Sequence, residues 1–232
     1  MLPPTHPSRS LEDIVSNELY FDSIGHLYRA MSWLDYFERN DRFTALVYAC
    51  IEARFGIEHL IFEEIVISTG ANLSKEDYKK CLANPTKLYK MLRTISSEYE
   101  KLQEFTQIIV GISHELPNIL RWEPRKLIKS WGKISKYLHW YGSESETTDL
   151  SGWRKDVGRK VRKEIEPIWN KITSGYSGLM HPDHMHPRIL ELWNQFKIDD
   201  INTETTKIRM QVLQPLLQMD RGETVFLQEN RT

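Results

Sequence analysis

The sequence predicts an all-α protein built as an up-and-down helical bundle. Residues 42–67 form a long, mostly apolar run with no proline and a single glycine. Most other segments also show apolar residues at helical spacing, and short polar joints separate them. Within residues 42–67, about 100° of rotation per residue places on one side the apolar residues Phe43, Val47, Cys50, Ile51, Ile61 and Ile65.

A charged pair interrupts that apolar side, because Arg54 and Glu58 fall in its middle. The opposite face carries Glu52, His59 and Glu63. Burying an ion pair costs several kcal/mol unless partners satisfy it. Two interpretations stay open. The pair either ties this central helix to a neighbour, or presents a guanidinium at a cleft that grips phosphate or carboxylate.

The segments before the central helix predict two shorter helices. Residues 1–9 are proline-rich and are expected to be flexible. Ser10 can cap a helix that runs to about Tyr20, and Asp22 can cap a second one that ends near Asn40. The short joint before residue 42 favours antiparallel neighbours. The later helices are expected at residues 75–82, 86–93, 98–120, 124–141, 153–173 and 188–196.

The second half of the chain divides at residues 142–152, GSESETTDLSG, which form a polar loop after a bundle of residues 10–141. Residues 153–200 are accessory helices, either separate from that bundle or part of it. From residue 201 onwards Ile208, Met210 and Val212 alternate with polar residues. Residues 201–232 are therefore expected to form a short C-terminal β-hairpin or an extended tail.

Composition limits the function classes. The formal net charge is −1, so nucleic-acid binding requires a local basic patch. The two cysteines form no disulfide framework; Cys50 lies on the apolar face of the central helix, which suits a reducing cytoplasm. No apolar run approaches the roughly 18 residues of a membrane span, so no membrane association is expected.

Residues 131–140, WGKISKYLHW, carry the second polar pair. Ser135 and His139 are four residues apart and share a side with Trp131 and Gly132. Gly132 and Ser135 are small, so another helix could approach closely there. His139 is expected in that seam beside an acidic partner. It either forms a structural hydrogen bond with Glu58 or acts as a general acid and base whose pKa that carboxylate raises.

The segments ARFGIEHL (residues 53–60) and KISKYLH (residues 133–139) together resemble the HEPN superfamily, in its defence-associated or uncharacterised branch. The resemblance covers about residues 22–141. It implies an up-and-down helical bundle that forms a homodimer. It also implies a metal-independent ribonuclease of toxin–antitoxin or antiviral systems, or a relative that only binds RNA or nucleotides. The expected partners are RNA and an antitoxin or other protein, and no cofactor or metal is expected.

The catalytic signature of that superfamily is an arginine, four to six residues and a histidine near the last bundle helix. Before His139 the arginine position holds Gly132, Lys133 or Ile134, of which only Lys133 is basic. Arg54 and His59 match the spacing, but five residues rotate a helix by about 140°, so their side chains face apart. Either Lys133 or Arg54 supplies the cation beside His139, or nuclease activity is absent.

In the enzymatic version, His139 moves the proton, Arg54 or Lys133 stabilises the phosphorane charge, and Ser135 orients the substrate. Two segments could hold the histidine of this catalytic signature, one with His139 and the other with His181. YSGLMHP, which contains His181, is also similar to the end of a HEPN helix, and in that case the bundle extends to about residue 182. His181, His184 and His186 lie close together near Asp183, but two prolines and no cysteine favour a surface loop over a zinc site.

A basic run follows the polar loop. Lys155, Arg159 and Arg162 share one helix face, with Trp153 available for base stacking. This face is either a solvated surface or a strip that contacts RNA phosphates. The expected function is an RNA-directed protein of a prokaryotic defence or stress system. It is a weak ribonuclease or a descendant that has lost catalysis. The alternative is a helical dimerisation or adaptor module whose polar pairs are structural.

Overall fold

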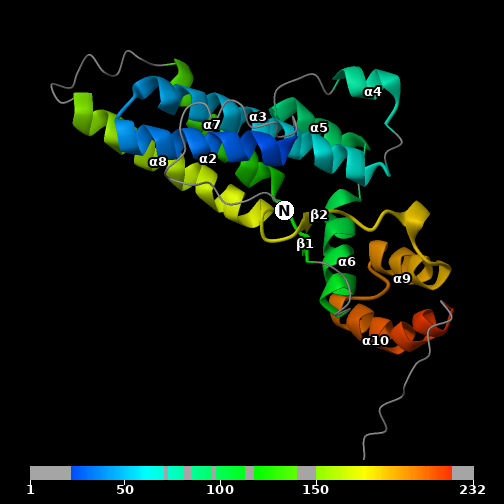
Figure 1. Ribbon diagram of the computed structural model, residues 1–232. Helices are drawn as coiled ribbons and strands as arrows, with labels where there is room; N and C mark the ends of the chain where they lie inside the picture. The colour runs from blue at the N-terminus through cyan, green and yellow to red at the C-terminus, as the bar shows by residue number, and fades with distance from the viewer. Residues whose placement is uncertain are drawn as a thin grey trace, which may run out of the picture.

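The computed structural model describes residues 22–70, 73–80, 85–95, 98–112, 118–139 and 150–220. It confirms the all-α class. Figure 1 shows an elongated bundle and a smaller group of helices at one end of it. The expected helix at residues 10–20 and most of the polar loop lie outside the described residues. In the described part of the chain, no helix is long and apolar enough to cross a membrane.

The predicted N-cap and the short turn at the start of the bundle are both present. Helix α2 (Ser23–Asn40) begins after Asp22, whose carboxylate accepts the Gly25 N–H at 2.7 Å. The chain turns at Asp41, which has a left-handed φ of 50°, and enters α3 (Phe43–Ser68). The two helices pack side by side, and α3 also contacts α5, α7 and α8. The expectation of a central helix is therefore confirmed.

The buried side of α3 overlaps only in part with the side that the sequence predicted, since Cys50, Ile61 and Ile65 are buried but Phe43, Val47 and Ile51 are only partly so. Arg54 and Glu58 lie at its edge, with about a quarter of each side chain exposed. The fully buried carboxyl group is Glu64, which is 1% exposed. Apolar residues surround α3 on several sides because the four neighbouring helices α2, α5, α7 and α8 cover it, so periodicity alone does not define one inward direction. The buried positions are Ala45, Leu46, Ala49, Cys50, Ala53, Gly56, Ile57, Leu60, Ile61, Glu64, Ile65 and Ser68.

Three later helices complete the bundle: α5 (Pro85–Ile95), α7 (Pro124–His139) and α8 (Leu150–Ile172). The short α4 (Lys75–Lys80) lies before α5. Helix α8 buries apolar side chains in the main core, so this accessory segment is part of the same bundle. Its core residues are Val157, Val161, Ile165, Ile168, Trp169 and Ile172.

A glycine allows α8 to pack closely on α2. A Cβ atom at Gly158 would lie 2.4 Å from Cε1 of the buried Phe37 ring. We expect Gly158→Val to lower the free energy of unfolding by about 2 kcal/mol, because overpacking displaces that ring. Urea denaturation measures the effect. The control is Gly132→Ala on α7, where a Cβ atom meets nothing within 4 Å. Equal stability of the two variants would contradict the prediction.

The open space at Gly132 also corrects an expectation, since none of the described helices approaches α7 closely at that residue. The smaller group has its own core, formed by α6 (Tyr99–Ile112), α9 (Pro187–Lys197) and α10 (Thr203–Asp220). Helix α6 was expected inside the main bundle, but its side chains from Leu102 onwards pack in this second core. The buried members of that core are Leu102, Phe105, Ile108, Ile109, Met185, Ile189, Leu192, Trp193, Phe196, Ile201 and Met210.

Two short strands lie between the two cores. The helix expected at residues 98–120 ends earlier, and Ile119–Leu120 form β1. This strand pairs in parallel with β2 (Tyr176–Ser177), which follows α8. The 3₁₀ helix η2 (Pro182–His184) then leads to α9. The parallel pair brings together segments that are far apart in the sequence.

The expected β-like tail is wrong for residues 203–220, which form α10. The Asn202 side chain accepts the Thr205 N–H at 2.9 Å and so caps this helix. Thr206 and Met210 are buried one helical turn apart, and packing against α6 and α9 outweighs the β-type alternation. The strand expected at residues 224–227 lies outside the described residues.

Candidate nucleic-acid interface

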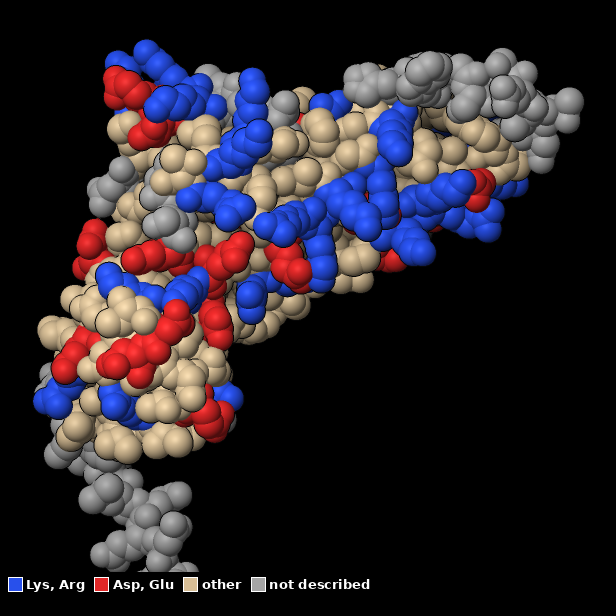
Figure 2. Space-filling view, turned by 180° about the vertical axis from the view of Figure 1, so that it is seen from behind, with Lys and Arg blue, Asp and Glu red and all other residues tan. Residues whose placement is uncertain are grey.

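Basic residues concentrate on two neighbouring helices of the main bundle. Helix α7 carries no acidic residue and five basic ones, Arg125, Lys126, Lys129, Lys133 and Lys136. Helix α8 carries three acidic residues and seven basic ones, Arg154, Lys155, Arg159, Lys160, Arg162, Lys163 and Lys171. Figure 2 shows Lys and Arg side chains extending along one face of the elongated bundle. Because the whole chain has a net charge of −1, this excess is local.

The few acidic groups on this face do not neutralise it. Lys133 pairs with Glu164 at 2.5 Å, and Lys160 pairs with Asp156 at 2.5 Å. The Lys160–Asp156 pair is exposed, and pairs of this kind contribute little energy and exchange readily with other ions. Within the described ranges, no carboxylate lies within 4.0 Å of the exposed ammonium groups of Lys129 and Lys155. The α7–α8 face therefore presents unneutralised positive charge to solvent.

Two of the four residues expected to bind RNA lie exposed on this face, and two have other roles. Lys155 and Arg159 are exposed. Arg162 instead donates hydrogen bonds to Asp35 at 2.7 Å and to Glu38 at 2.6 Å, which ties α8 to α2. Trp153 is half-buried, and its ring centroid lies 5.9 Å from that of Phe43. A long arginine can reach either solvent or a neighbouring helix, and sequence spacing does not distinguish the two.

The polar groups of α3 do meet a polar group of α7, but the partner is a tryptophan. Trp131 donates its indole N–H to Glu58 Oε1 at 2.7 Å. The Arg54 guanidinium lies 4.7 Å from the centroid of the Trp131 ring, and one of its nitrogens is 3.9 Å from Glu58. This geometry combines a cation–π contact with a charge-assisted hydrogen bond. It matches the interpretation in which the pair ties the central helix to its neighbour.

The remaining residues of the expected catalytic set have separate partners. Ser135 donates to the Trp131 carbonyl at 2.7 Å within its own helix. Lys133 points to Glu164 on α8, whereas Arg54 points to Trp131. His139 is the last residue of α7, and its side chain lies outside the described part of the structure. The structure therefore brings Arg54 and Glu58 together and leaves Lys133 and Ser135 apart from them.

The spacing match between Arg54 and His59 does not form a pair, as predicted from helix rotation. The His59 ring lies 5.0 Å from the His26 ring on α2. There the sequence reasoning missed a polar cluster, in which Glu52 Oε2 lies 2.7 Å from His26 Nδ1 and 3.0 Å from Arg29 Nε. Burial raises the pKa of Glu52, but the hydrogen bonds with His26 and Arg29 outweigh it and hold that pKa below its usual range. The spacing of His26 and Arg29, three residues apart, was the available signal.

The histidines around η2 cap helices. His181 Nδ1 accepts the Asp183 N–H at 3.3 Å, and His186 Nδ1 accepts the Arg188 N–H at 3.3 Å. Among the residues that the structure describes, no three His, Cys, Asp or Glu side chains are placed to hold a metal ion. This segment is a loop with a single 3₁₀ turn, as expected.

Cys50 is a buried free thiol, as its place in the apolar run predicted. Desolvation raises its pKa to about 12, so the thiolate is not formed at neutral pH and the residue is a small hydrophobe.

Comparisons of the chain with protein-family models, curated proteins and solved structures found no match.

Proposed function

We propose that this protein binds RNA through the α7–α8 face. The observation that carries the proposal is the excess of twelve basic over three acidic residues on two adjacent helices of a chain with almost no net charge. Lysine and arginine side chains that neutralise phosphates release counterions, which drives binding of nucleic acids without sequence preference. A flat row of cations along a bundle suits an extended phosphate backbone.

Binding without cleavage is the version that the geometry supports best. Arg54, Glu58 and Ser135 have partners inside the protein, and Lys133 is paired with Glu164. The placement in a prokaryotic defence or stress system follows from the resemblance to HEPN proteins and remains part of the proposal. A ribonuclease version would depend on His139. The adaptor alternative is favoured by three exposed apolar residues at four-residue spacing on α10, Ile208, Val212 and Leu216.

Salt dependence of RNA binding tests the proposal. We expect the dissociation constant for a single-stranded RNA to rise steeply with salt concentration. The triple variant Lys129→Gln, Lys155→Gln and Arg159→Gln should bind at least tenfold more weakly. Its slope of log affinity against log salt should be smaller by about 2, because each lost phosphate contact removes about 0.7 for single strands. Fluorescence anisotropy with labelled RNA measures both quantities.

The matched control removes the same charge elsewhere, with Lys75→Gln, Lys79→Gln and Lys90→Gln on α4 and α5. It should keep the wild-type affinity and slope. Absent or salt-insensitive binding by the wild type would refute RNA binding and favour the adaptor module. Incubation of the RNA with chelator, beside a His139→Ala variant, separates the two RNA-directed versions. Intact RNA in both samples supports binding alone, and cleavage only by the wild type supports a ribonuclease.

A further inference from the structure

A cavity of about 220 Å³ opens between α7 and α8 on this basic face. It lies beside Pro167, which is inside the continuous helix α8. Proline has no N–H to donate to the carbonyl of Lys163 four residues earlier, and its ring displaces that turn of the helix. Both Lys163 and Pro167 line the cavity.

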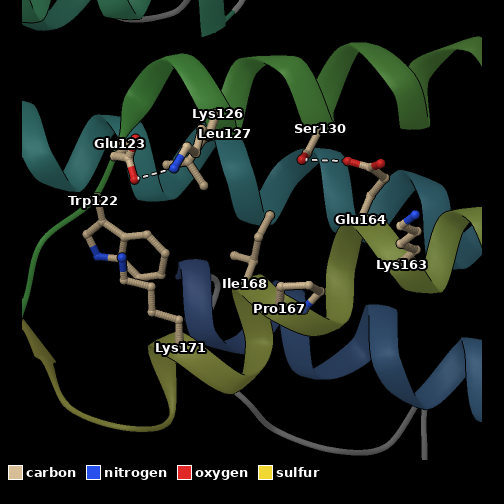
Figure 3. Close-up of a pocket in the computed structure, with 10 residues that line it drawn as sticks. All are labelled: Trp122, Glu123, Lys126, Leu127, Ser130, Lys163, Glu164, Pro167, Ile168 and Lys171. Atoms are coloured by element: carbon tan, nitrogen blue, oxygen red, sulfur yellow. Dashed lines mark hydrogen bonds and ion pairs between the residues drawn. The ribbon is translucent and has the colours of Figure 1, made fainter.

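The cavity is closed at its inner end. Trp122, Leu127 and Ile168 line it, and each of them belongs to the main hydrophobic core and is at most 7% exposed. Figure 3 shows these side chains on the inner side, between the ribbons of α7 and α8. An extended polymer therefore cannot pass through the cavity, but the end of a chain can enter it.

Three lysines and two glutamates surround this apolar floor, but the glutamates are already engaged. Glu123 pairs with Lys126 at 2.7 Å. Glu164 accepts from the Ser130 hydroxyl at 2.8 Å and also pairs with a lysine of α7. For the other two cavity lysines, Lys163 and Lys171, no carboxylate of the described residues lies within 4.0 Å. Figure 3 shows these two lysines at opposite ends of the cavity, with the Lys171 ammonium beside Trp122 and the Lys163 ammonium beyond Glu164.

The ammonium group of Lys171 has lost part of its hydration. Its ammonium lies 4.9 Å from the centroid of the Trp122 ring and donates a hydrogen bond to the Arg121 carbonyl. Burial lowers the pKa of Lys171, and the nearby charges of Lys126 and Arg121 act in the same direction, against the opposing charge of Glu123. An anion in the cavity would replace the lost hydration of this ammonium group.

We propose that the cavity binds the terminal phosphomonoester of an RNA whose backbone lies on the α7–α8 face. This inference rests on the proposed function and adds a preference for one kind of chain end. A phosphomonoester carries up to two negative charges at neutral pH, whereas an internal phosphodiester carries one. Lys171 and Lys126, which lie at the Trp122 end of the cavity in Figure 3, supply the two matching cations. Lys126 can turn from Glu123 to the phosphate, because their exposed pair is weak.

The test compares three RNA oligonucleotides of one sequence, with a 5′-phosphate, a 3′-phosphate or hydroxyl groups at both ends. We expect one phosphorylated form to bind the wild-type protein about tenfold more tightly than the hydroxyl form. That form identifies which end enters the cavity. Lys126→Met and Lys171→Met should each reduce the preference to about twofold or less, with salt-dependent binding of the hydroxyl form retained. Inorganic phosphate should compete for the preference in the wild type.

Circular dichroism of both variants confirms that they are folded, and Lys75→Met on α4 is the matched control that should keep the full preference. Equal affinity of the wild type for all three oligonucleotides, with a normal salt slope, would refute the cavity assignment and leave RNA binding intact. An unchanged preference in both folded variants would refute it as well. If none of the three RNAs binds, the proposed function itself fails.

Discussion

Glu64 should cause the protein to lose about 3 kcal/mol of unfolding free energy as the pH rises from 4.5 to about 7. Its carboxyl group is 1% exposed, between α3 and the start of α6. One oxygen accepts from the Tyr99 hydroxyl at 2.5 Å and from Gln103 Nε2 at 3.2 Å. Among the residues that the structure describes, the other oxygen has no hydrogen-bond partner. Desolvation raises the pKa of Glu64 from 4.5 to about 7, although both hydrogen bonds act in the opposite direction.

Stability falls with rising pH because Glu64 binds its proton more tightly in the folded protein than in the unfolded chain. Below pH 4.5 Glu64 is protonated in both states, and the folded protein has the full contribution. As the pH rises, the unfolded chain ionises first, so stability is lost until the pH passes the folded pKa of about 7. Above that pH the contribution of Glu64 no longer changes.

Glu64→Gln should remove this dependence, because glutamine keeps an acceptor for Tyr99 and does not ionise. The difference in unfolding free energy, variant minus wild type, should grow by about 3 kcal/mol between pH 4 and pH 8 in chemical denaturation. Glu191→Gln, at an exposed position on α9, is the control and should give a constant difference. Parallel curves for the wild type and Glu64→Gln would contradict the assignment.

Arg162→Met should destabilise the protein by about 3 kcal/mol and leave RNA affinity unchanged. The substitution would remove the cation that hydrogen-bonds Asp35, a carboxylate that is only 8% exposed, and would also break the bond to Glu38. Removal of one partner of a buried pair costs more than the pair contributes, because the remaining charge stays desolvated. Urea denaturation and RNA anisotropy on the same protein measure both effects.

Arg159→Met, three residues earlier on the same helix, is the matched control. Arg159 is exposed and lies 3.5 Å from Asp156 in a weak pair. Its replacement should change stability by less than about 1 kcal/mol and weaken RNA binding. The opposite pattern, with Arg162→Met stable but defective in RNA binding, would restore Arg162 to the RNA-binding surface and remove its structural role.

Arg159 and Arg162 show what sequence spacing can predict and what it cannot. Spacing predicted a shared helix face for Lys155, Arg159 and Arg162, but it does not specify how far round that face the next helix reaches. Asp35 and Glu38 on α2 accept hydrogen bonds from Arg162, whereas Arg159 remains exposed to solvent. For the same reason the sequence favoured Glu58 as the buried carboxylate of α3, whereas contacts with α6 bury Glu64.

Local chemistry by itself determined the all-α class, the bounds of α2, α3 and α7, the cap at Asp22 and the basic character of α7 and α8, since each depends on residues within a few positions of one another. Tertiary packing alone decided that α6 joins α9 and α10, that residues 203–220 are helical, and which charged side chains are paired. Those outcomes depend on which helix covers which face. That choice minimises exposed apolar area over the whole chain, and no single window of sequence contains it.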